Sequence, residues 1–256
     1  MKKILIGIFI TIFLLNLSAT DVNASHSWGN YHWARTSNPF TLKLGDNLSS
    51  NWKPYLASTS SDWSVSNVLD TSIAAGLGRK NCNPTSGRVE VCNKKYGNNG
   101  WLGIAQIWVT GSHITQGVTK MNDTYFNTTK YNTSAWKNLV LCQEVGHTLG
   151  LDHQDEIFDN PNLDTCMDYT NNPLTNQHPN THDYEELETI YLHLDSISTL
   201  KKGFKQMARQ NVLENLDNLD KVSEWGKLIK NNGKIAKYER KLIDGATLHT
   251  FIVWAE

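Results

Sequence analysis

This sequence has few charged residues of either sign. The 24 Lys and Arg residues nearly balance the 25 Asp and Glu residues, so the formal net charge is −1. Proteins that hold nucleic acids or anionic membranes mainly through charge carry a strong positive excess. No nucleic acid and no anionic membrane is therefore expected as the main partner.

Motifs of several other classes are also absent. The sequence has no internal repeat, no glycine-rich phosphate loop and no nucleophile elbow, so Ser-His-Asp hydrolysis has no local support. Its cysteines form no C-x-x-C pair, which disfavours a zinc site built from cysteine alone. It also lacks an obvious zymogen switch.

A long apolar run occurs once, near the N-terminus. The basic start Met1-Lys2-Lys3 precedes the apolar residues 4–17, and Val22-Asn23-Ala24 offers a cleavage site. The run is shorter than the roughly 20 residues of a membrane-spanning helix. We therefore predict a signal peptide over 1–24, a secreted product and no stable membrane anchor.

Residues 143–153 read QEVGHTLGLDH. This is the zinc-peptidase pattern H-E-x-x-H-x-x-G-x-x-H with glutamine in place of the first histidine. On a helix, Gln143 and His147 project from the same face, with Glu144 beside them. Gly150 can adopt the left-handed conformation that ends a helix, so that the chain returns His153 toward the same point.

These residue types suit one chemistry. Catalytic zinc takes three protein ligands and a water whose pKa falls to about 7. Gln143, His147 and His153 are the predicted ligands, and Glu144 is the predicted general base that passes the proton of the water to the leaving amine. The plain alternative is a helix with two incidental histidines.

A second motif follows at Cys166-Met167-Asp168-Tyr169-Thr170. It resembles the Met-turn of the metzincin metallopeptidases, and the chain as a whole resembles a secreted, matrixin-like metzincin. The resemblance is specific over 136–169 and weaker over 101–125. It implies that Met167 lies beneath the zinc-binding histidines and that Tyr169 contacts the zinc or the oxyanion. A core methionine beside an ordinary tyrosine is the alternative.

The departure from that family lies at Gln143. An amide oxygen is a weaker donor to zinc than an imidazole nitrogen. Gln143 either binds zinc through its oxygen, leaves His147 and His153 to hold it with Tyr169 or another donor, or marks a site without metal. Two hypotheses follow: a zinc metalloendopeptidase that hydrolyses peptide bonds in proteins, and a catalytically inactive protein that uses the same fold for binding.

The remaining histidines and acidic residues carry weaker predictions. His113 is the first substitute to consider for the missing imidazole, although turn histidines are more often structural. His26 and His32 could reach a metal, but flexible termini seldom build preorganised sites, so both are interpreted as surface residues. His178, His182 and His193 are interpreted as surface or core residues. The acidic loop 153–164 offers oxygen donors that suit Ca²⁺, although a solvated loop is the commoner outcome and EF-hand spacing is absent.

The resemblance and the patterns together predict an α+β, zincin-like fold with a twisted mixed sheet and an active-site helix. The expected divisions are a signal peptide (1–24), a catalytic domain (25–196), a linker or exposed helix (197–221) and a small β module (222–256), in a monomer.

Alternation predicts strands over 40–44, 66–73, 100–109, 113–121, 225–229, 234–240 and 247–254. Residues 103–108 are expected to be the edge strand that pairs with substrate. Helices are predicted over 51–66, through 143–149 from a cap at Thr133 or Ser134, and over 181–194 from a cap at Thr181.

Four cysteines in an exported chain suggest two disulfides. The local pair Cys82 and Cys92 would leave Cys142 with Cys166, although sequence alone leaves the connectivity open. The second bridge would tie the residue before Gln143 to the residue before Met167.

Overall fold

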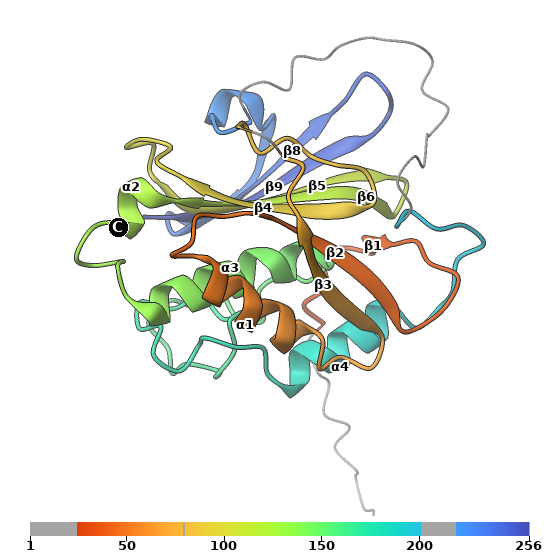
Figure 1. Ribbon diagram of the computed structural model, residues 1–256, viewed down its shortest axis with the longest axis horizontal. Coiled ribbons are helices and arrows are strands. Elements are labelled where there is room, and N and C mark those ends of the chain that lie inside the picture. The colour runs from red at the N-terminus through yellow and green to blue at the C-terminus, as the bar shows by residue number, and fades with distance from the viewer. Residues whose placement is uncertain (1–24, 79, 201–218, 256) are drawn as a thin grey trace, which may run out of the picture.

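A computed structural model describes residues 25–78, 80–200 and 219–255. A nine-stranded mixed sheet crosses the molecule, and the longer helices lie against one of its faces (Figure 1). This arrangement confirms the α+β class. The signal peptide expected over 1–24 and most of the linker expected over 197–221 lie outside the described residues. In the described ranges, no helix combines the length and the apolar character needed to cross a membrane.

The sheet has two halves that differ in strand direction. The parallel half contains, in spatial order, β3 (Leu69–Ala75), β2 (Phe40–Asn47), β4 (Arg88–Lys94) and β6 (His113–Asn122). The antiparallel half continues from β6 with β5 (Trp101–Thr110), β9 (Thr247–Trp254), β8 (Ile235–Lys241) and β7 (Lys227–Asn231). The short strand β1 (His32–Trp33) pairs with β6 off this path.

In the part of the chain that the structure describes, four helices accompany the sheet: α1 (Lys53–Trp63), α2 (Asp123–Phe126), α3 (Ser134–Thr148) and α4 (Thr181–Ile190), with a 3₁₀ turn η1 (Val222–Glu224) near the C-terminal strands. The cap expected at Thr181 is one residue out of register. Asn180 caps α4, because its side chain accepts from the Asp183 backbone N–H while the Asp183 carboxylate accepts from the Asn180 backbone N–H.

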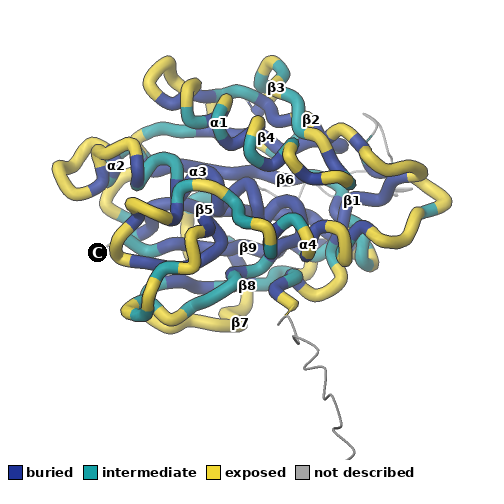
Figure 2. The backbone as a smooth tube through the Cα atoms, turned by 90° about the horizontal axis from the view of Figure 1, so that it is seen from below, coloured by how far each residue is buried: buried dark blue, intermediate teal, exposed yellow. Residues whose placement is uncertain are grey.

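The expectation that 103–108 forms the edge of the cleft is wrong. β9 pairs antiparallel with β5 from Gly103 opposite Val253 to Trp108 opposite Leu248, so β5 has neighbours on both sides. β9 is buried on both faces, as Figure 2 shows by its dark tube, because Phe251 belongs to the core under the helices while Ile252 packs with Trp101 on the other face. Apolar residues on both faces suit an interior strand.

The small β module expected over 222–256 takes a different form. Its strands exist, but through β9 they extend the same sheet as the preceding residues. Trp225, just before β7, is fully buried against Trp101, Ile104 and Ile252. The C-terminal segment therefore shares an apolar core with β5.

Helix α3 begins as the sequence predicts. The Thr133 side chain accepts a hydrogen bond from the Trp136 backbone N–H, at 3.2 Å. The helix ends before Gly150, whose φ of +101° lies in the left-handed region. A side chain at Gly150 would also meet the carbonyl oxygen of Tyr31 at 2.3 Å. This tight turn sends the chain back along the helix toward His153.

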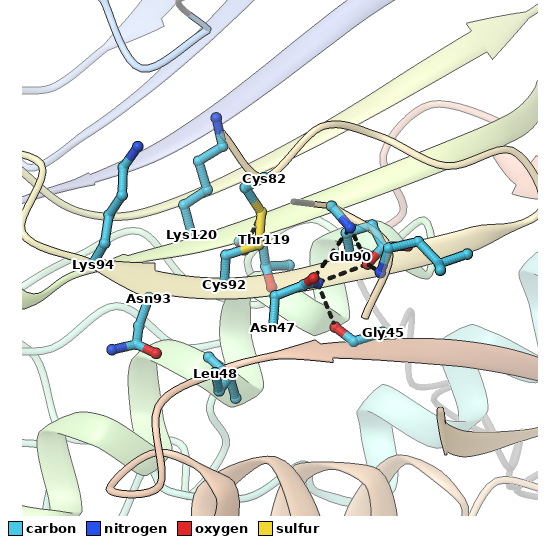
Figure 3. Close-up of a disulfide and its surroundings, with 12 residues drawn as sticks. Gly45, Asn47, Leu48, Cys82, Glu90, Cys92, Asn93, Lys94, Thr119 and Lys120 are labelled. Carbon is cyan, nitrogen blue, oxygen red and sulfur yellow. Dashed lines mark hydrogen bonds between the residues drawn. A yellow bond between two sulfur atoms is a disulfide. The ribbon is translucent and has the colours of Figure 1, made fainter. Parts of the chain in front are cut away.

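Both expected disulfides form. Cys82–Cys92 lies next to Thr119 and Lys120 of β6 (Figure 3), and Cys142–Cys166 joins α3 to the Met-turn segment. The loop before Cys82 is anchored by the buried carboxylate of Glu90, which accepts from the backbone N–H groups of Leu77 at 3.0 Å and Gly78 at 3.1 Å. The same carboxylate accepts from the Asn47 side chain at 2.7 Å (Figure 3). Disulfides are typical of chains that fold in oxidising compartments.

Candidate functional site

The two motif histidines converge. Nε2 of His147 on α3 lies 3.2 Å from Nε2 of His153, and the two rings are nearly perpendicular. Nδ1 of His147 lies 2.9 Å from the carbonyl oxygen of Leu151. Since a carbonyl only accepts, Nδ1 carries the hydrogen and Nε2 of the neutral ring presents a lone pair to His153. Burial holds the pKa of His147 well below its ordinary value, so this ring is neutral.

Glu144 lies on the same helix and is fully enclosed. Neither of its carboxylate oxygens has a hydrogen-bond partner among the described residues. It fills the space beside Gly103 of β5, where a side chain would come within 2.5 Å of its Oε1. Burial raises the pKa of Glu144 well above its ordinary value. Burial therefore favours the neutral form of this carboxyl group over the carboxylate.

Gln143 is oriented by the Met-turn segment. Its amide N–H donates to the carbonyl oxygen of Cys166 at 2.9 Å, and the amide makes no hydrogen bond to either histidine. Gln143 also lines a small, mainly apolar pocket with residues of α3, β5, β9, the loops before α3 and after His153, and the Met-turn segment: Leu102, Tyr131, Trp136, Leu139, Val140, Phe158, Tyr169, Thr170, Val253 and Trp254.

The Met-turn residues lie beneath and beside the histidines. Met167 is fully buried, and its sulfur would be only 2.5 Å from a side chain at Gly146, directly before His147. The Tyr169 ring centroid lies 6.1 Å from that of His153. The Tyr169 hydroxyl donates to the carbonyl oxygen of Lys234 at 2.8 Å. Burial raises its pKa above the ordinary value, so the hydroxyl keeps its proton.

The C-terminal strands supply contacts that sequence reasoning missed. The Phe251 ring of β9 stacks on His147 with centroids 4.0 Å apart and planes 9° from parallel. Lys237 of β8 lies 2.6 Å from both carboxylate oxygens of Asp152 and 3.0 Å from Glu156. These two carboxylates flank His153, each 3.7 Å from its Nδ1. One feature of the sequence could have indicated these contacts: the strand 247–254 carries apolar residues on both of its faces.

The charges around His153 also shape the acidity of Glu156. Its burial would raise the pKa, but the neighbouring side chains of His153, Lys230 and Lys237 outweigh that effect and lower it. Lys230 of β7 forms an ion pair with the same carboxylate. Glu156 is thus an anion held between the C-terminal hairpin and the candidate metal-binding loop.

Several sequence candidates lie away from this site. His113 joins His32, His193 and Asp195 instead of the motif histidines. In the acidic loop, the side chain of Asp155 accepts from the Ile157 backbone N–H and from Asn160. Within the described ranges, this loop contributes to one close group of potential metal ligands, which consists of Asp152, His153 and Glu156.

Comparison with protein-family models finds no match to this chain. A search of curated proteins also finds none.

Proposed function

We propose that this chain is an exported, zinc-dependent endopeptidase of the matrixin-like metzincin type. The observation that carries the proposal is the 3.2 Å separation of the His147 and His153 Nε2 atoms. Tetrahedral zinc with ligand distances of about 2.0–2.1 Å places its ligand nitrogens about 3.3 Å apart. The two rings therefore stand at the spacing that one ion requires.

The unsatisfied polar atoms around these rings fit such an ion. Glu144 has two unpartnered oxygens in an enclosed space, and unpartnered buried carboxyl groups are uncommon in native proteins. Gln143 is held by Cys166 in a way that leaves its amide oxygen free to be the third donor. Zinc held by these residues would supply an acidified water and polarise the substrate carbonyl.

The chain's own residues would then perform the proton transfer. Glu144 accepts a proton from the attacking water and gives it to the leaving amine, which requires that the carboxyl group first be hydrated and ionised. Tyr169 donates its hydroxyl hydrogen to the developing oxyanion once it is released from Lys234. The substrate is a protein or peptide, because the polarised carbonyl would be that of a peptide bond.

Metal content tests the proposal directly. The full chain, exported from an expression host, is expected to carry zinc when measured by elemental mass spectrometry, and His153→Ala is expected to lose that equivalent. Zinc-loaded protein should cleave an unstructured protein in a chelator-sensitive manner, while Glu144→Gln keeps zinc and loses cleavage. Wild-type protein that takes up no zinc at this site would contradict the proposal.

One observation favours the second candidate, a catalytically silent binding protein. Glu144 is walled off from solvent and Phe251 covers the face of His147. If the purified chain is free of metal and remains inactive after Gln143→His, the cleft is a packed core and the binding hypothesis holds.

A further inference from the structure

A second histidine cluster lies away from the proposed active site. Nε2 of His32 on β1 is 3.1 Å from Nε2 of His193, which follows α4. The carboxylate Oδ1 of Asp195 lies 3.5 Å from the His32 nitrogen and 3.7 Å from the His193 nitrogen. These three atoms form a small triangle, with one corner from the N-terminal segment and two from the segment after α4.

Hydrogen bonds with neighbouring groups fix the orientation of the His32 ring and the Asp195 carboxylate. Nδ1 of His32 lies 2.8 Å from the carbonyl oxygen of Asn30, so Nδ1 carries the hydrogen and Nε2 of the neutral ring has a lone pair. Asp195 is held through its other oxygen, Oδ2, by the Arg35 guanidinium at 2.9 Å and the Arg35 backbone N–H at 3.2 Å. A backbone carbonyl on histidine and a hydrogen-bonded carboxylate are typical second partners of metal ligands.

The spacing matches a tetrahedral ion. The edges of 3.1, 3.5 and 3.7 Å lie close to the roughly 3.3 Å between donors of tetrahedral zinc. His113, opposite His32 in the β1–β6 register, places its Nε2 3.1 Å from Asp195 Oδ1. It stands next to the triangle as a fourth donor or as the group that steadies the carboxylate.

We infer that His32, His193 and Asp195 bind a divalent transition metal, with zinc the best match to two imidazoles and a carboxylate. The His32 and Asp195 side chains are only 5% and 9% exposed, while that of His193 is 55% exposed and gives the ion a route from solvent. The bound ion would join β1 to the segment after α4. It would therefore be structural and independent of peptide hydrolysis.

The experiment compares zinc binding by the full chain and two matched variants. His193→Ala removes an exposed ligand, while His178→Ala alters a histidine with the same 55% side-chain exposure that contacts Asp62 instead. We expect His193→Ala to bind one zinc fewer and to lose the zinc-dependent rise in Tm, with His178→Ala like wild type. Cobalt titration should give tetrahedral absorption that His193→Ala reduces.

Equal zinc stoichiometry in wild type and His193→Ala would overturn the inference and make the cluster a hydrogen-bonded network. The zinc bound at this cluster can be counted separately from zinc at the proposed active site, because His153→Ala removes only the active-site zinc. A wild-type chain that binds no zinc outside the His147–His153 pair overturns it equally.

The C-terminal strands carry a second inference, which rests on the proposed function. In peptide recognition by strand addition, an extended segment pairs with a free sheet edge through its backbone. β9 occupies that position on β5, with the ladder running from Gly103 to Trp108. The edge on which a substrate would pair is therefore filled by the chain itself.

The same segment engages three groups of the proposed site. Phe251 covers His147, the carbonyl of Lys234 accepts the Tyr169 hydroxyl, and Lys237 binds the carboxylates on either side of His153. We propose that residues 219–255 are an intramolecular inhibitor and that peptide hydrolysis requires their displacement from β5. Displacement would open the substrate edge, uncover His147 and admit water to Glu144.

Charge reversal tests this inhibition in the full chain. Lys237→Glu places a third carboxylate beside Asp152 and Glu156, whereas Lys241→Glu makes the same change at an exposed position of the same strand. We expect Lys237→Glu to cleave a fluorogenic peptide at least tenfold faster than Lys241→Glu, with faster hydrogen exchange along β9. Equal cleavage by active variants overturns the inhibition. Zinc-loaded Lys237→Glu with an exchanging β9 and no cleavage overturns the proposed function instead.

Discussion

Phe251 lies flat on the imidazole of His147, at a centroid separation of 4.0 Å. This contact joins the last strand of the sheet to the helix that carries the zinc-peptidase motif. It gives one side chain two opposed roles, because the ring fills the core and also closes one face of a candidate metal ligand.

Removing that ring should separate the two roles. Phe251→Ala is expected to lower the free energy of unfolding by about 3–5 kcal/mol, the usual cost of a buried phenylalanine. Zinc affinity should rise in the same variant, since His147 becomes accessible. Chemical denaturation measures the expected loss of stability, and zinc titration of the same preparation measures the expected gain in zinc affinity. A variant that loses stability without binding zinc more tightly would show that the ring does not obstruct the ion.

Replacing Gln143 with histidine restores the third imidazole of the motif. Gln143→His should strengthen zinc binding by more than the roughly 10-fold to 100-fold that outer-shell changes cause. Competition with a zinc-binding dye measures the change. Lys137→His, near the start of the same helix, serves as the control. Unchanged affinity would mean that position 143 does not face the ion.

The close approach of Gly103 and Glu144 predicts a coupled pair. Gly103→Ala inserts a methyl group 2.5 Å from the Glu144 carboxylate, and overpacking of this kind costs about 1–3 kcal/mol. Adding Glu144→Ala should recover part of that loss, so thermal denaturation of the four proteins should reveal a non-additive cycle. Gly117→Ala, where the nearest contact is 3.1 Å, should cost less. Additive effects would contradict the contact.

His249 predicts a loss of stability in acid. This β9 side chain is buried opposite Glu239 and beside Trp28 and Tyr31, and burial lowers its pKa to about 4 although Glu239 opposes the shift. The neutral ring is favoured in the folded chain, so its contribution is complete above pH 6.5 and declines as pH falls to about 4. At about 1.4 kcal/mol per unit, the decline is about 3 kcal/mol at most. Urea denaturation should show a steeper slope in wild type than in His249→Gln, which keeps the contribution of other buried histidines such as His26, whose pKa burial also lowers to about 4.

The two disulfides offer a matched comparison. Replacing Cys142 and Cys166 by serine should cost about 3 kcal/mol by loop entropy, and the Cys82 and Cys92 pair should cost a similar amount. The loss of Cys142–Cys166 should also weaken zinc binding, because it frees the Met-turn from the helix beneath Gln143. Calorimetry together with zinc titration distinguishes the pairs. Equal zinc affinity in both variants would show that the bridge does not set the site.

Local patterns predicted the parts of the site that lie close together in the sequence. Helical spacing and a cap at Thr133 placed Glu144 and His147, and the turn at Gly150 returned His153 to them. Such features depend on a few consecutive residues, so the sequence contains the information directly. The roles of these residues in hydrolysis remain predictions.

The same reasoning could not predict which strands pair when they lie far apart in the sequence. The alternation over 247–254 predicted a strand but not its partner, because the choice of β5 depends on residues more than a hundred positions away. The sequence left His32 and His113 as possible metal donors without partners, and His193 was interpreted as a surface or core residue. Only the β1–β6 register and the path after α4 bring them to one carboxylate.

Side chains alternate along β9, so Phe251 faces α3 while Thr250 and Ile252 face away. A slip of one residue reverses every such assignment along a strand. One residue added to or removed from the turn at 242–246 would therefore exchange the aromatic ring over His147 for a hydroxyl or an aliphatic chain. The character of the surface above the zinc motif is thus decided by the length of a distant turn.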